Sequence, residues 1–404
     1  MSRLSRRALL RKMFVADTKT NSNDETTLVF IFLRGGADTL NMLVPFGDDE
    51  YYRARPTIAI PVPGKSLKES ALRLDDFYGL HPRLEPILPL YQDGKLAFVQ
   101  AVGSDNLSGS HFDAQDQLEH GVAYNRTANG GWLGRYLSTS TSALTALSAV
   151  AIGTIIPESL RGAPTVSAMV SLEEVQLKTP TGDSCAACKT LGALYNSELS
   201  LITESGRETL ALLDRVRNLK GNQKSSDDKL NYPKDGFGSG LREVACMVRG
   251  NVGLKVACLD FGGWDTHFFQ GSAAGLQADN IDSLAMGLAA FDADLGDHRK
   301  KVVTLVMTEF GRRTYENGSM GTDHGRGFAS IAMGAQIIGG KVHGDWPGFK
   351  NQETDVLGPS GLKIAYDYRS VMAEILTGVL GNRAIDKIFP DFQPEAIGLV
   401  ERRA

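Results

Sequence analysis

Short apolar runs that end abruptly in polar, glycine-rich turns constrain the fold of this chain most. They are rich in β-branched and aromatic residues and lie at 27–33, 96–103, 254–260 and 301–309. Runs of this length and composition predict buried strands. Apolar residues at three- and four-residue spacing predict helices between them, at 82–93, 113–120, 197–219, 238–249 and 274–294. This alternation predicts an α/β fold with a doubly wound, mainly parallel sheet flanked by helices.

The balance of charge and hydropathy excludes two classes of partner. The formal net charge is −4, so no broad basic surface is expected to attract nucleic acid or anionic lipid. No run of about 18 apolar residues occurs, which argues against a membrane span. With 42% apolar residues and 44 glycines in 404, the chain is predicted to be globular, with its main domain over residues 26–404.

Polar clusters follow the expected strands or lie shortly downstream of them. In a doubly wound sheet, ligands bind beyond the carboxyl ends of the strands. We therefore expect residues that are distant in the sequence to converge in one crevice. The segment from about 140 to 235 contains Ser/Thr runs, several prolines and a polar stretch at 220–229. We interpret it as an insertion or cap over that crevice.

Four of the seven histidines lie in short runs crowded with Asp and Gly, at 110–113, 262–267, 321–325 and 342–345. Imidazole and carboxylate groups are the usual side-chain ligands of zinc and related divalent ions, and glycine-rich turns let the backbone direct them to one point. An ordinary loop histidine would explain a single cluster, but four clusters favour a metal site. The remaining histidines lack such neighbours and are expected to be structural: His81, His120 and His298.

The N-terminal segment bears on localisation. Residues 5–12 (Ser-Arg-Arg-Ala-Leu-Leu-Arg-Lys) resemble a twin-arginine export signal, which makes residues 1–25 a candidate leader. The apolar stretch that follows, at 13–16, is shorter than the roughly 7–15 residues of a signal. Two alternatives stay open: export by the twin-arginine machinery to the periplasm or beyond, or an eroded leader on a cytoplasmic protein.

The four cysteines leave the compartment open. Cys246 and Cys258 lie among apolar residues and are expected in the core. Cys185 and Cys188 form a Cys-Ala-Ala-Cys pair, which fits either a small local disulfide after export or an incidental loop pair. No second close pair exists that would complete a four-cysteine zinc site.

Five motifs resemble a bacterial family called domain of unknown function 1501, and the resemblance covers nearly the whole chain after residue 25. They are Phe-Leu-Arg-Gly-Gly-Ala-Asp at 32–38, Ser-His-Phe-Asp-Ala-Gln at 110–115, Gly-Trp-Asp-Thr-His at 263–267, Glu-Phe-Gly-Arg at 309–312 and Gly-Thr-Asp-His-Gly at 321–325. That family resembles the alkaline phosphatase-like superfamily, whose doubly wound sheet carries one or two divalent metals. The resemblance implies the same fold here and a divalent metal, with zinc preferred to Mn, Mg or Ca.

The superfamily has an Asp after the first strand, a nucleophilic hydroxyl at a helix start, and later Asp and His ligands. The resemblance implies Asp38 as the first ligand, where a turn-stabilising role is the alternative, and Asp323 with His324 as the later metal pair. Asp265 and His267 supply a further pair. They are two residues apart, so they can share an ion on a strand end or loop but not on a helix. The superfamily's pair is four apart, which leaves open whether Asp265 and His267 bind the same ion.

Glu309 and His343 complete the candidate ligand set. Glu309 directly follows an expected strand, where it either substitutes for a carboxylate ligand or anchors a neighbouring element through Arg312 and Arg313. His343 lies in the last glycine-rich turn and resembles the superfamily's final histidine ligand. An ordinary surface loop histidine is the alternative for that position.

Ser110, His111 and Arg34 are the candidate catalytic residues. A hydroxyl just before the expected helix would lie beside backbone amides that favour anions, and a metal could activate it. Ser110 is preferred to Ser108 because His111 adjoins it, although helix N-capping explains a serine there equally well. Arg34 adjoins the first cluster and offers paired donors to phosphate or sulfate, as do Arg312 and one further arginine, Arg326.

These features favour a metal-dependent hydrolase of a phosphate or sulfate ester, with an anionic small-molecule or polymer-borne substrate. A formylglycine-type sulfatase is disfavoured because no Cys-x-Pro-x-Arg or Ser-x-Pro-x-Arg sequence occurs. The rival interpretation is a non-catalytic exported binding or assembly protein that keeps the fold and a structural metal. The ambiguous nucleophile and the altered Asp/His spacing count in favour of that rival.

Overall fold

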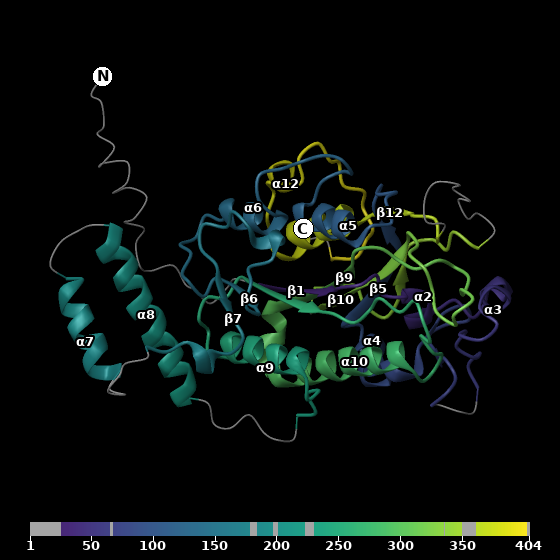
Figure 1. Ribbon diagram of the computed structural model, residues 1–404, viewed down its shortest axis with the longest axis horizontal. Helices are drawn as coiled ribbons and strands as arrows, with labels where there is room; N and C mark the ends of the chain where they lie inside the picture. The colour runs from purple at the N-terminus through teal and green to yellow at the C-terminus, as the bar shows by residue number, and fades with distance from the viewer. Residues whose placement is uncertain are drawn as a thin grey trace.

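The computed structural model describes residues 26–64, 68–177, 184–196, 201–222, 230–334, 336–349 and 361–401. Within them the chain forms three layers, a central sheet with helices on both faces (Figure 1). The predicted α/β fold class is therefore confirmed. The leader at 1–25, including its twin-arginine-like segment, lies outside the described residues.

The central sheet has nine strands in the described part of the chain. Their order is β11-β5-β10-β9-β1-β8-β6-β7, with β12 also paired to β5. Adjacent strands are parallel except at β10, which is antiparallel to both β5 and β9. The strands are β1 (Thr27–Leu33), β5 (Leu96–Gly103), β6 (Ala149–Ile152), β7 (Ser167–Met169), β8 (Val256–Phe261), β9 (Val302–Thr308), β10 (Phe328–Gly334), β11 (Val342–His343) and β12 (Tyr366–Asp367).

The four predicted strands are β1, β5, β8 and β9 of the sheet, within two residues of the expected bounds. β10 was not predicted, because its sequence Phe-Ala-Ser-Ile-Ala-Met-Gly is dominated by small residues and lacks a run of β-branched ones. A smaller antiparallel sheet joins β2 (Leu43–Val44), β4 (Gly79–Leu80) and β3 (Leu72–Arg73). The short helices α2 (Thr39–Met42) and α3 (Asp49–Ala54) lie in the same N-terminal part of the sequence as these three strands.

Alternate residues of β1 pack into two separate cores. One core contains Val29, Ile31 and Leu33 together with apolar residues of η1 (Pro82–Ile87), α4 (Leu88–Gln92), α9 (Gly236–Arg249) and α10 (Leu276–Leu295). The other contains Leu28, Phe30 and Phe32 together with residues of α5 (His111–His120), α6 (Trp132–Ser138), α11 (Tyr368–Glu374), η5 (Ile375–Val379) and α12 (Ile385–Ile388). Because helices cover both faces, the strand is apolar at every position rather than at alternate ones.

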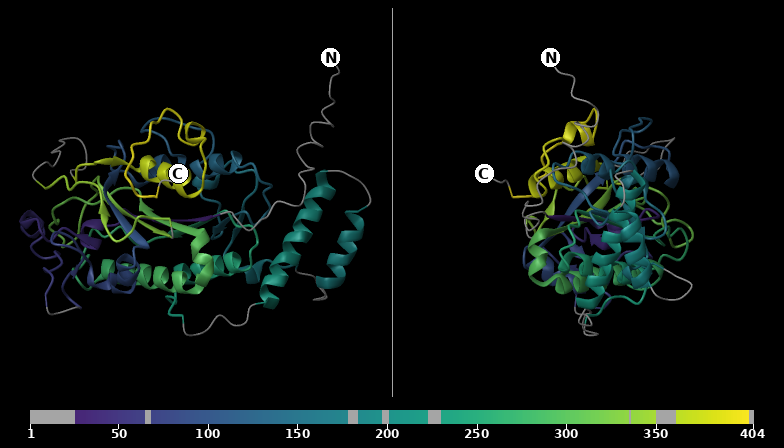
Figure 2. Two further views of the ribbon diagram at one scale, coloured as in Figure 1. Left: turned by 180° about the vertical axis from the view of Figure 1, so that it is seen from behind. Right: turned by 90° about the vertical axis from the view of Figure 1, so that its left-hand side faces the viewer.

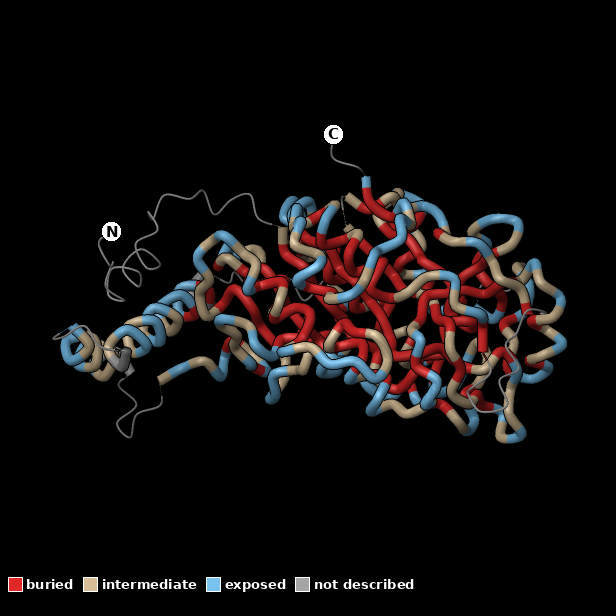
Figure 3. The backbone as a smooth tube through the Cα atoms, turned by 90° about the horizontal axis from the view of Figure 1, so that it is seen from above, coloured by how far each residue is buried: buried red, intermediate tan, exposed pale blue. Residues whose placement is uncertain are grey.

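The segment expected to be an insertion or cap, at 140–235, divides into two parts. Its first part supplies β6 and β7 to the main sheet, with the short helices η2 (Glu158–Leu160) and η3 (Leu172–Glu174). Its second part contains α7 (Ser184–Leu194) and α8 (Leu201–Asn222), which lie side by side and project from one end of the body (Figure 2). Figure 3 shows the buried residues concentrated in the body rather than along this pair. The boundary at 140 is thus corrected, because β6 and β7 belong to the sheet.

Three cysteines have described side chains. Cys246 and Cys258 are buried, as predicted, whereas Cys188 on α7 is partly buried. None of these three cysteines forms a disulfide with another described residue. Among the described residues, every helix is too short or too polar to cross a lipid bilayer.

His81 is a buried structural histidine that caps η1. Its Nδ1 accepts a hydrogen bond from the backbone N–H of Arg83 (3.1 Å), so its Nε2 carries the hydrogen and donates to the carbonyl of Ser272 (3.0 Å). Burial lowers the pKa of His81 to about 4, because a charged imidazolium would lose its hydration there. Protonation of Nδ1 would also remove the acceptor that caps the helix.

We expect the stability cost of His81→Asn to depend on pH. Below pH 6.5 the unfolded state binds a proton that the folded state does not bind until about pH 4, so the stabilisation from neutral His81 is complete above pH 6.5 and is lost as the pH falls toward 4. Asn keeps a capping oxygen but does not titrate. The cost should therefore shrink by up to about 3 kcal/mol between pH 7 and pH 4, measured by urea unfolding.

The matched control is His298→Asn, because His298 is exposed in η4 (Gly296–Lys301) and its replacement removes an imidazole without disturbing a buried hydrogen bond. A cost for His81→Asn that is the same at both pH values would contradict the assignment of His81 as a neutral cap.

Candidate metal centre

Loops that follow three strands meet at the carboxyl edge of the sheet. They are 104–111 after β5, 262–267 after β8 and 309–312 after β9. A fourth loop, 321–325, joins them through an isolated bridge between Arg312 and His324. The strand pattern of the sequence predicts such a convergence, because parallel strands present their carboxyl ends at one edge.

Three imidazoles surround one carboxylate in these loops. Oδ1 of Asp265 lies 3.0 Å from Nε2 of His267, 3.4 Å from Nε2 of His324 and 3.5 Å from Nε2 of His111. The Nε2 atoms of His267 and His324 are 2.9 Å apart. The four side chains, called the His-Asp cluster below, are 22–46% exposed, so the cluster is open to solvent.

Each imidazole of the cluster is oriented through its other nitrogen. Nδ1 of His111 is 2.8 Å from Oε1 of Glu309, and Nδ1 of His267 is 3.1 Å from Oδ1 of Asp323. Nδ1 of His324 is 2.7 Å from the carbonyl oxygen of Gly109. A carbonyl or ionised carboxylate can only accept, so each Nδ1 donates and each neutral ring presents a lone pair at Nε2.

The inward-facing Nε2 atoms are suited to binding a cation. At 2.9 Å, the Nε2 atoms of neutral His267 and His324 face each other without a hydrogen between them. Nε2 of His111 is buried and has no hydrogen-bond partner among the described residues. A divalent ion, or failing that a proton, would resolve both features. This arrangement, with carboxylate or carbonyl acceptors behind the ligating histidines, is the usual environment of a bound transition metal.

The donor separations around Asp265 are close to those of a zinc site. Nitrogen ligands about 2.0–2.1 Å from tetrahedral zinc lie roughly 3.3 Å from one another; the three distances to Oδ1 of Asp265 and the distance between His267 and His324 run from 2.9 to 3.5 Å. One ligand atom each from His111, Asp265 and His324 fall within 4.8 Å of one another. Three imidazoles and one carboxylate suit zinc and related transition metals better than Mg or Ca, which prefer oxygen.

The local environment favours the ligating or supporting protonation states of Asp265, Glu309 and His324, whereas the hydrogen bond to Glu309 raises the pKa of His111 and favours its protonated form. Burial alone would raise the pKa of Glu309, but hydrogen bonds from His111 and Gln115 lower it to about 2. Burial would likewise raise the pKa of Asp265, yet its bond to Arg312 holds that pKa below the usual value. Burial lowers the pKa of His324, which favours the neutral form that a metal requires.

Arg312 is a buried anchor rather than a free oxyanion binder. Its guanidinium donates to the carbonyl oxygens of Gly35, Gly36, Trp264 and Thr322, and Nη2 lies 2.5 Å from Oδ1 of Asp265. These contacts join three of the loops that form the site. The sequence placed Arg312 beside a cluster but gave no indication that its donors are all used within the protein.

Asp38 lies apart from the cluster contacts. It is fully buried, and its two oxygens form an ion pair with the guanidinium of Arg55, at 2.5 and 3.0 Å. Oδ2 also accepts from Nε2 of Gln270 (2.7 Å). The positive charge of Arg55 balances the charge of Asp38 within the fold. Asp38, predicted to be a metal ligand, therefore contacts Arg55 and Gln270 and not the other candidate ligands.

Arg34 and His343 also have partners outside the cluster. The guanidinium of Arg34 binds Glu119 (2.9 Å) and Asp260 (3.0 Å), which neutralise it. His343 is buried on β11 at the sheet edge, where its Nε2 lies 2.8 Å from the carbonyl of Ile338. The structure therefore does not bring the predicted catalytic Arg34 or the predicted ligand His343 to the cluster.

Ser110 is the N-cap of α5, directly before the cluster residue His111. Its Oγ accepts from the backbone N–H of Asp113 at 3.4 Å, and its own N–H donates to Oγ of Ser108 (3.1 Å). The long capping bond and partial exposure leave the hydroxyl accessible. Both sequence interpretations of Ser110, capping and chemistry, are thus compatible with its position.

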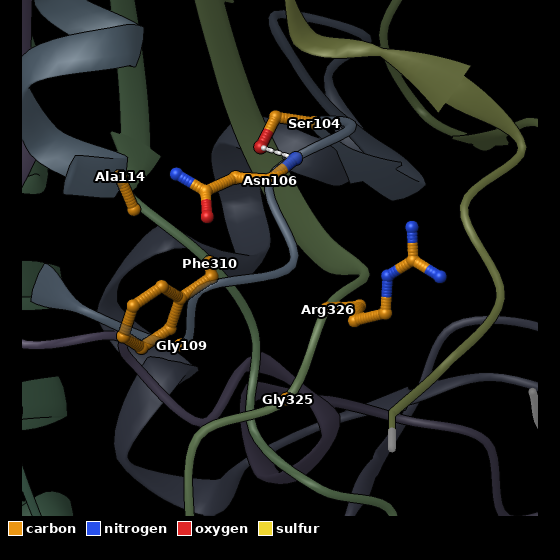
Figure 4. Close-up of a pocket in the computed structure, with 7 residues that line it drawn as sticks. All are labelled: Ser104, Asn106, Gly109, Ala114, Phe310, Gly325 and Arg326. Atoms are coloured by element: carbon orange, nitrogen blue, oxygen red, sulfur yellow. Dashed lines mark hydrogen bonds between the residues drawn. The ribbon is translucent and has the colours of Figure 1, made fainter. Parts of the chain in front are cut away.

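A small pocket lies beside the cluster (Figure 4). Phe310 in its wall also packs against His111 and His324, with ring centroids 4.9 and 4.8 Å apart. The wall includes Asn106, whose Nδ2 is buried without a hydrogen-bond partner in the described part of the chain. Its remaining lining comes from Ser104, Gly109, Ala114, Gly325 and Arg326.

Sequence reasoning missed the residues that orient the ligands. Gln115 donates to Oε1 of Glu309 (2.8 Å), and Asn317 donates to Oδ1 of Asp323 (3.1 Å). It also treated His111 as catalytic, whereas the geometry groups it with the ligands. The signal for Gln115 was its position four residues after His111, on the same side of the helix. For Asn317 the sequence carried no comparable signal.

Comparison with protein families gives one match, to the family described as "Protein of unknown function (DUF1501)", over residues 25–362. Among curated proteins, none matches the sequence significantly. The family match agrees with the resemblance of the five motifs and covers all residues of the His-Asp cluster.

Solved structures with a similar arrangement are distant. The C-terminal periplasmic domain of EcEptC from Escherichia coli, solved in complex with Zn, is 10% identical over 78% of this chain and 75% of its own, with a TM-score of 0.34. The PsFucS1 sulfatase from Pseudoalteromonas sp. is 11% identical over 79% and 64%, with a TM-score of 0.32. The alkaline phosphatase of the Antarctic bacterium TAB5 is 10% identical over 77% and 92%, with a TM-score of 0.25. The chemistry must therefore be argued from the site itself.

We expect His111→Ala to abolish metal binding rather than only catalysis, because it removes one of the three residues whose ligand atoms lie within 4.8 Å of one another. Protein purified with zinc and then dialysed should retain metal in the wild type and in His120→Ala, which removes an imidazole at the other end of α5. His111→Ala should lose it while keeping its far-ultraviolet dichroism. Metal content is measured by mass spectrometry. Equal metal content in all three proteins would show that His111 is not a metal ligand and would leave it only the predicted catalytic role.

Glu309→Gln should weaken metal binding without removing a ligand. The amide still accepts from Nδ1 of His111 but carries no charge, and loss of such a supporting carboxylate typically lowers metal affinity roughly 10- to 100-fold. Competition with a chromogenic chelator measures this affinity. Glu395→Gln, on the exposed surface, is the control and should leave the affinity unchanged. An unchanged affinity in Glu309→Gln would show that Glu309 does not act on the metal through His111.

Proposed function

We propose that this chain, which belongs to the DUF1501 family of proteins of unknown function, is a metal-dependent hydrolase of a phosphate or sulfate ester. One observation carries the proposal: three Nε2 atoms converge on the carboxylate of Asp265 while each Nδ1 is held by an acceptor. That arrangement suits cation binding at a solvent-open edge of an α/β sheet, where such folds bind ligands.

Zinc is the metal that this ligand set favours, with Mn the nearest alternative and Mg or Ca less suited to three imidazoles. His111, Asp265, His267 and His324 would hold it. When bound, a divalent ion supplies positive charge to the ester oxygens and lowers the pKa of a nearby hydroxyl or water. Asp323 and Glu309 would stay outside the ligand set and orient the imidazoles.

Ser110 is the side chain of this protein best placed to attack the ester. Its hydroxyl precedes a cluster residue in the sequence and lies at the first turn of α5, where the free backbone N–H groups favour an anion. Water is the alternative nucleophile, with Ser110 then holding an ester oxygen. Arg326 lines the wall of the adjoining pocket, where a guanidinium can bind a phosphate or sulfate group.

A non-catalytic metal-binding protein is the second candidate, and specific observations favour it. Ser110 caps a helix, and the guanidinium groups of Arg34 and Arg312 are bound within the fold. In that case the metal would be structural and the protein would serve as an exported binding or assembly factor.

Export is part of the proposal. The twin-arginine-like residues 5–12 support delivery to the periplasm or the exterior, because that route carries proteins folded with their metal already bound. A cytoplasmic location is the alternative. Fusion of residues 1–25 to a reporter that functions only after export would decide between them.

The first experiment is a metal analysis followed by an ester panel. Purified protein should contain close to one equivalent of metal and should hydrolyse at least one chromogenic phosphate monoester, phosphate diester or sulfate ester with Zn or Mn added. The double variant His267→Ala with His324→Ala is the negative control. Tight stoichiometric metal without turnover of any ester would favour the non-catalytic candidate, and absence of bound metal would reject both.

Ser110→Asn separates capping from chemistry. Asn is as good an N-cap as Ser, so stability should change by less than about 0.5 kcal/mol. It cannot act as a nucleophile, so turnover should fall by more than about 100-fold with metal content unchanged. Ser108→Asn is the matched control, since Ser108 bonds Asn106 in the same loop. Full activity of Ser110→Asn would transfer the nucleophilic role to water.

A further inference from the structure

Large apolar side chains are exposed beside three of the cluster ligands. Phe112 follows His111 and is 87% exposed, and Phe268 and Phe269 follow His267 and are each 65% exposed. Met320, in the loop that leads to His324, is 44% exposed. We call these four residues the apolar rim.

Phe112 of the rim lies on α5, and the other three rim residues lie in two loops that run side by side at the cluster. The backbone N–H of Phe269 donates to the carbonyl of Ser319 (3.0 Å), and that of Gln270 donates to the carbonyl of Met320 (2.9 Å). The ring of Phe268 lies 6.5 Å from the imidazole of His267, measured between centroids. Phe268 therefore lies next to a cluster ligand, and Phe269 and Met320 lie in the two loops that carry His267 and His324.

Two of the rim residues have strained backbones. Phe269 has a φ of +46° and Met320 a φ of +55°, in the left-handed region that residues with bulky side chains rarely adopt. Glycine would fit both positions at lower cost. The protein instead places a large apolar side chain in solvent at each one. Strain of this kind persists where the surrounding structure enforces it and occurs most often at ligand sites.

The surrounding structure does enforce it. Gln270, directly after Phe269, is fully buried, and its Oε1 accepts from the hydroxyls of Thr266 (2.9 Å) and Thr322 (2.7 Å). Its Nε2 donates to buried Asp38 (2.7 Å). These bonds fix both loops relative to the body, so the exposed side chains of Phe269 and Met320 cannot turn inward without breaking a buried network.

Resting on the proposed function, we propose that the apolar rim binds the apolar alcohol portion of the ester substrate while the cluster receives its anionic group. A small polar ester would gain nothing from four exposed apolar side chains on the segments that carry the cluster ligands. An ester of an alkyl or aryl alcohol would bury them as its charged group reaches the ligands, and burial of apolar surface is favourable. The substrate class is therefore an amphiphilic phosphate or sulfate ester.

The test uses alkylphosphonates, which resemble the ester but cannot be hydrolysed, so it does not depend on turnover. Zinc-loaded full-length protein is titrated with methyl-, hexyl- and phenylphosphonate in a calorimeter. Hexylphosphonate should bind at least about tenfold more tightly than methylphosphonate, since each buried methylene adds affinity. Phenylphosphonate shows whether the rim prefers a ring to a chain. Equal affinities for the methyl and hexyl compounds overturn the proposal, even if ester turnover has been found.

The decisive variant is Phe269→Gly with Met320→Gly. Relief of the left-handed strain should leave thermal stability equal or higher, while the preference for hexyl- over methylphosphonate should fall to below about threefold. Leu194→Ser on α7 is the matched control, because it removes a similarly exposed apolar side chain from the projecting helical pair, and it should keep the preference. A preference that the glycine variant retains overturns the proposal.

A lipid surface is the competing occupant. Wild-type protein is mixed with phosphatidylglycerol vesicles and sedimented. Retention on vesicles that is lost in the glycine variant, together with equal phosphonate affinities, would assign the rim to membrane contact and overturn the proposal. Absence of retention together with a chain-length preference supports it.

Discussion

The ion pair between Arg312 and Asp265 is the interaction on which the rest of the site depends. Arg312 is fully buried, and its remaining donors bind carbonyl oxygens of the loop after β1 and of the loops at 264 and 322. A guanidinium is one of few side chains that can bind several acceptors in one plane. Because it fixes these loops at once, it also fixes the carboxylate around which the three imidazoles gather.

The imidazoles are fixed by a second set of contacts. Each Nδ1 donates to an acceptor that cannot itself donate, so each neutral ring must present Nε2 toward Asp265. The acceptors come from three different loops, at Gly109, Glu309 and Asp323. The orientation of the imidazoles therefore depends on three loops that meet at the carboxyl edge of the sheet, and no single motif determines it. The exposed rim next to it adds apolar contact where the cluster supplies charge, which suits an amphiphilic ester.

Several predictions from the sequence agree with the structure for a clear reason. β1, β5, β8 and β9 are continuous apolar runs because helices cover both faces of the sheet, and such runs are visible without any tertiary information. The clusters that follow them meet because parallel strands end at one edge. What the sequence did not predict is which group each of the candidate side chains contacts. Asp38 pairs with Arg55, and His343 contacts the carbonyl of Ile338, because neither charge nor spacing in the sequence shows which group a side chain will face.

The sequence by itself determined the fold class, the strands that carry the site and the residue types available for binding a cation, because periodicity and composition are local properties. Only the tertiary structure decided that His111 lies among the candidate ligands and that Arg34 and Arg312 form ion pairs with carboxylates of the protein. It also decided that β10 is antiparallel to both of its neighbours. Each of these outcomes depends on contacts between residues far apart in the chain, whose distances are set by packing and not by spacing along the sequence.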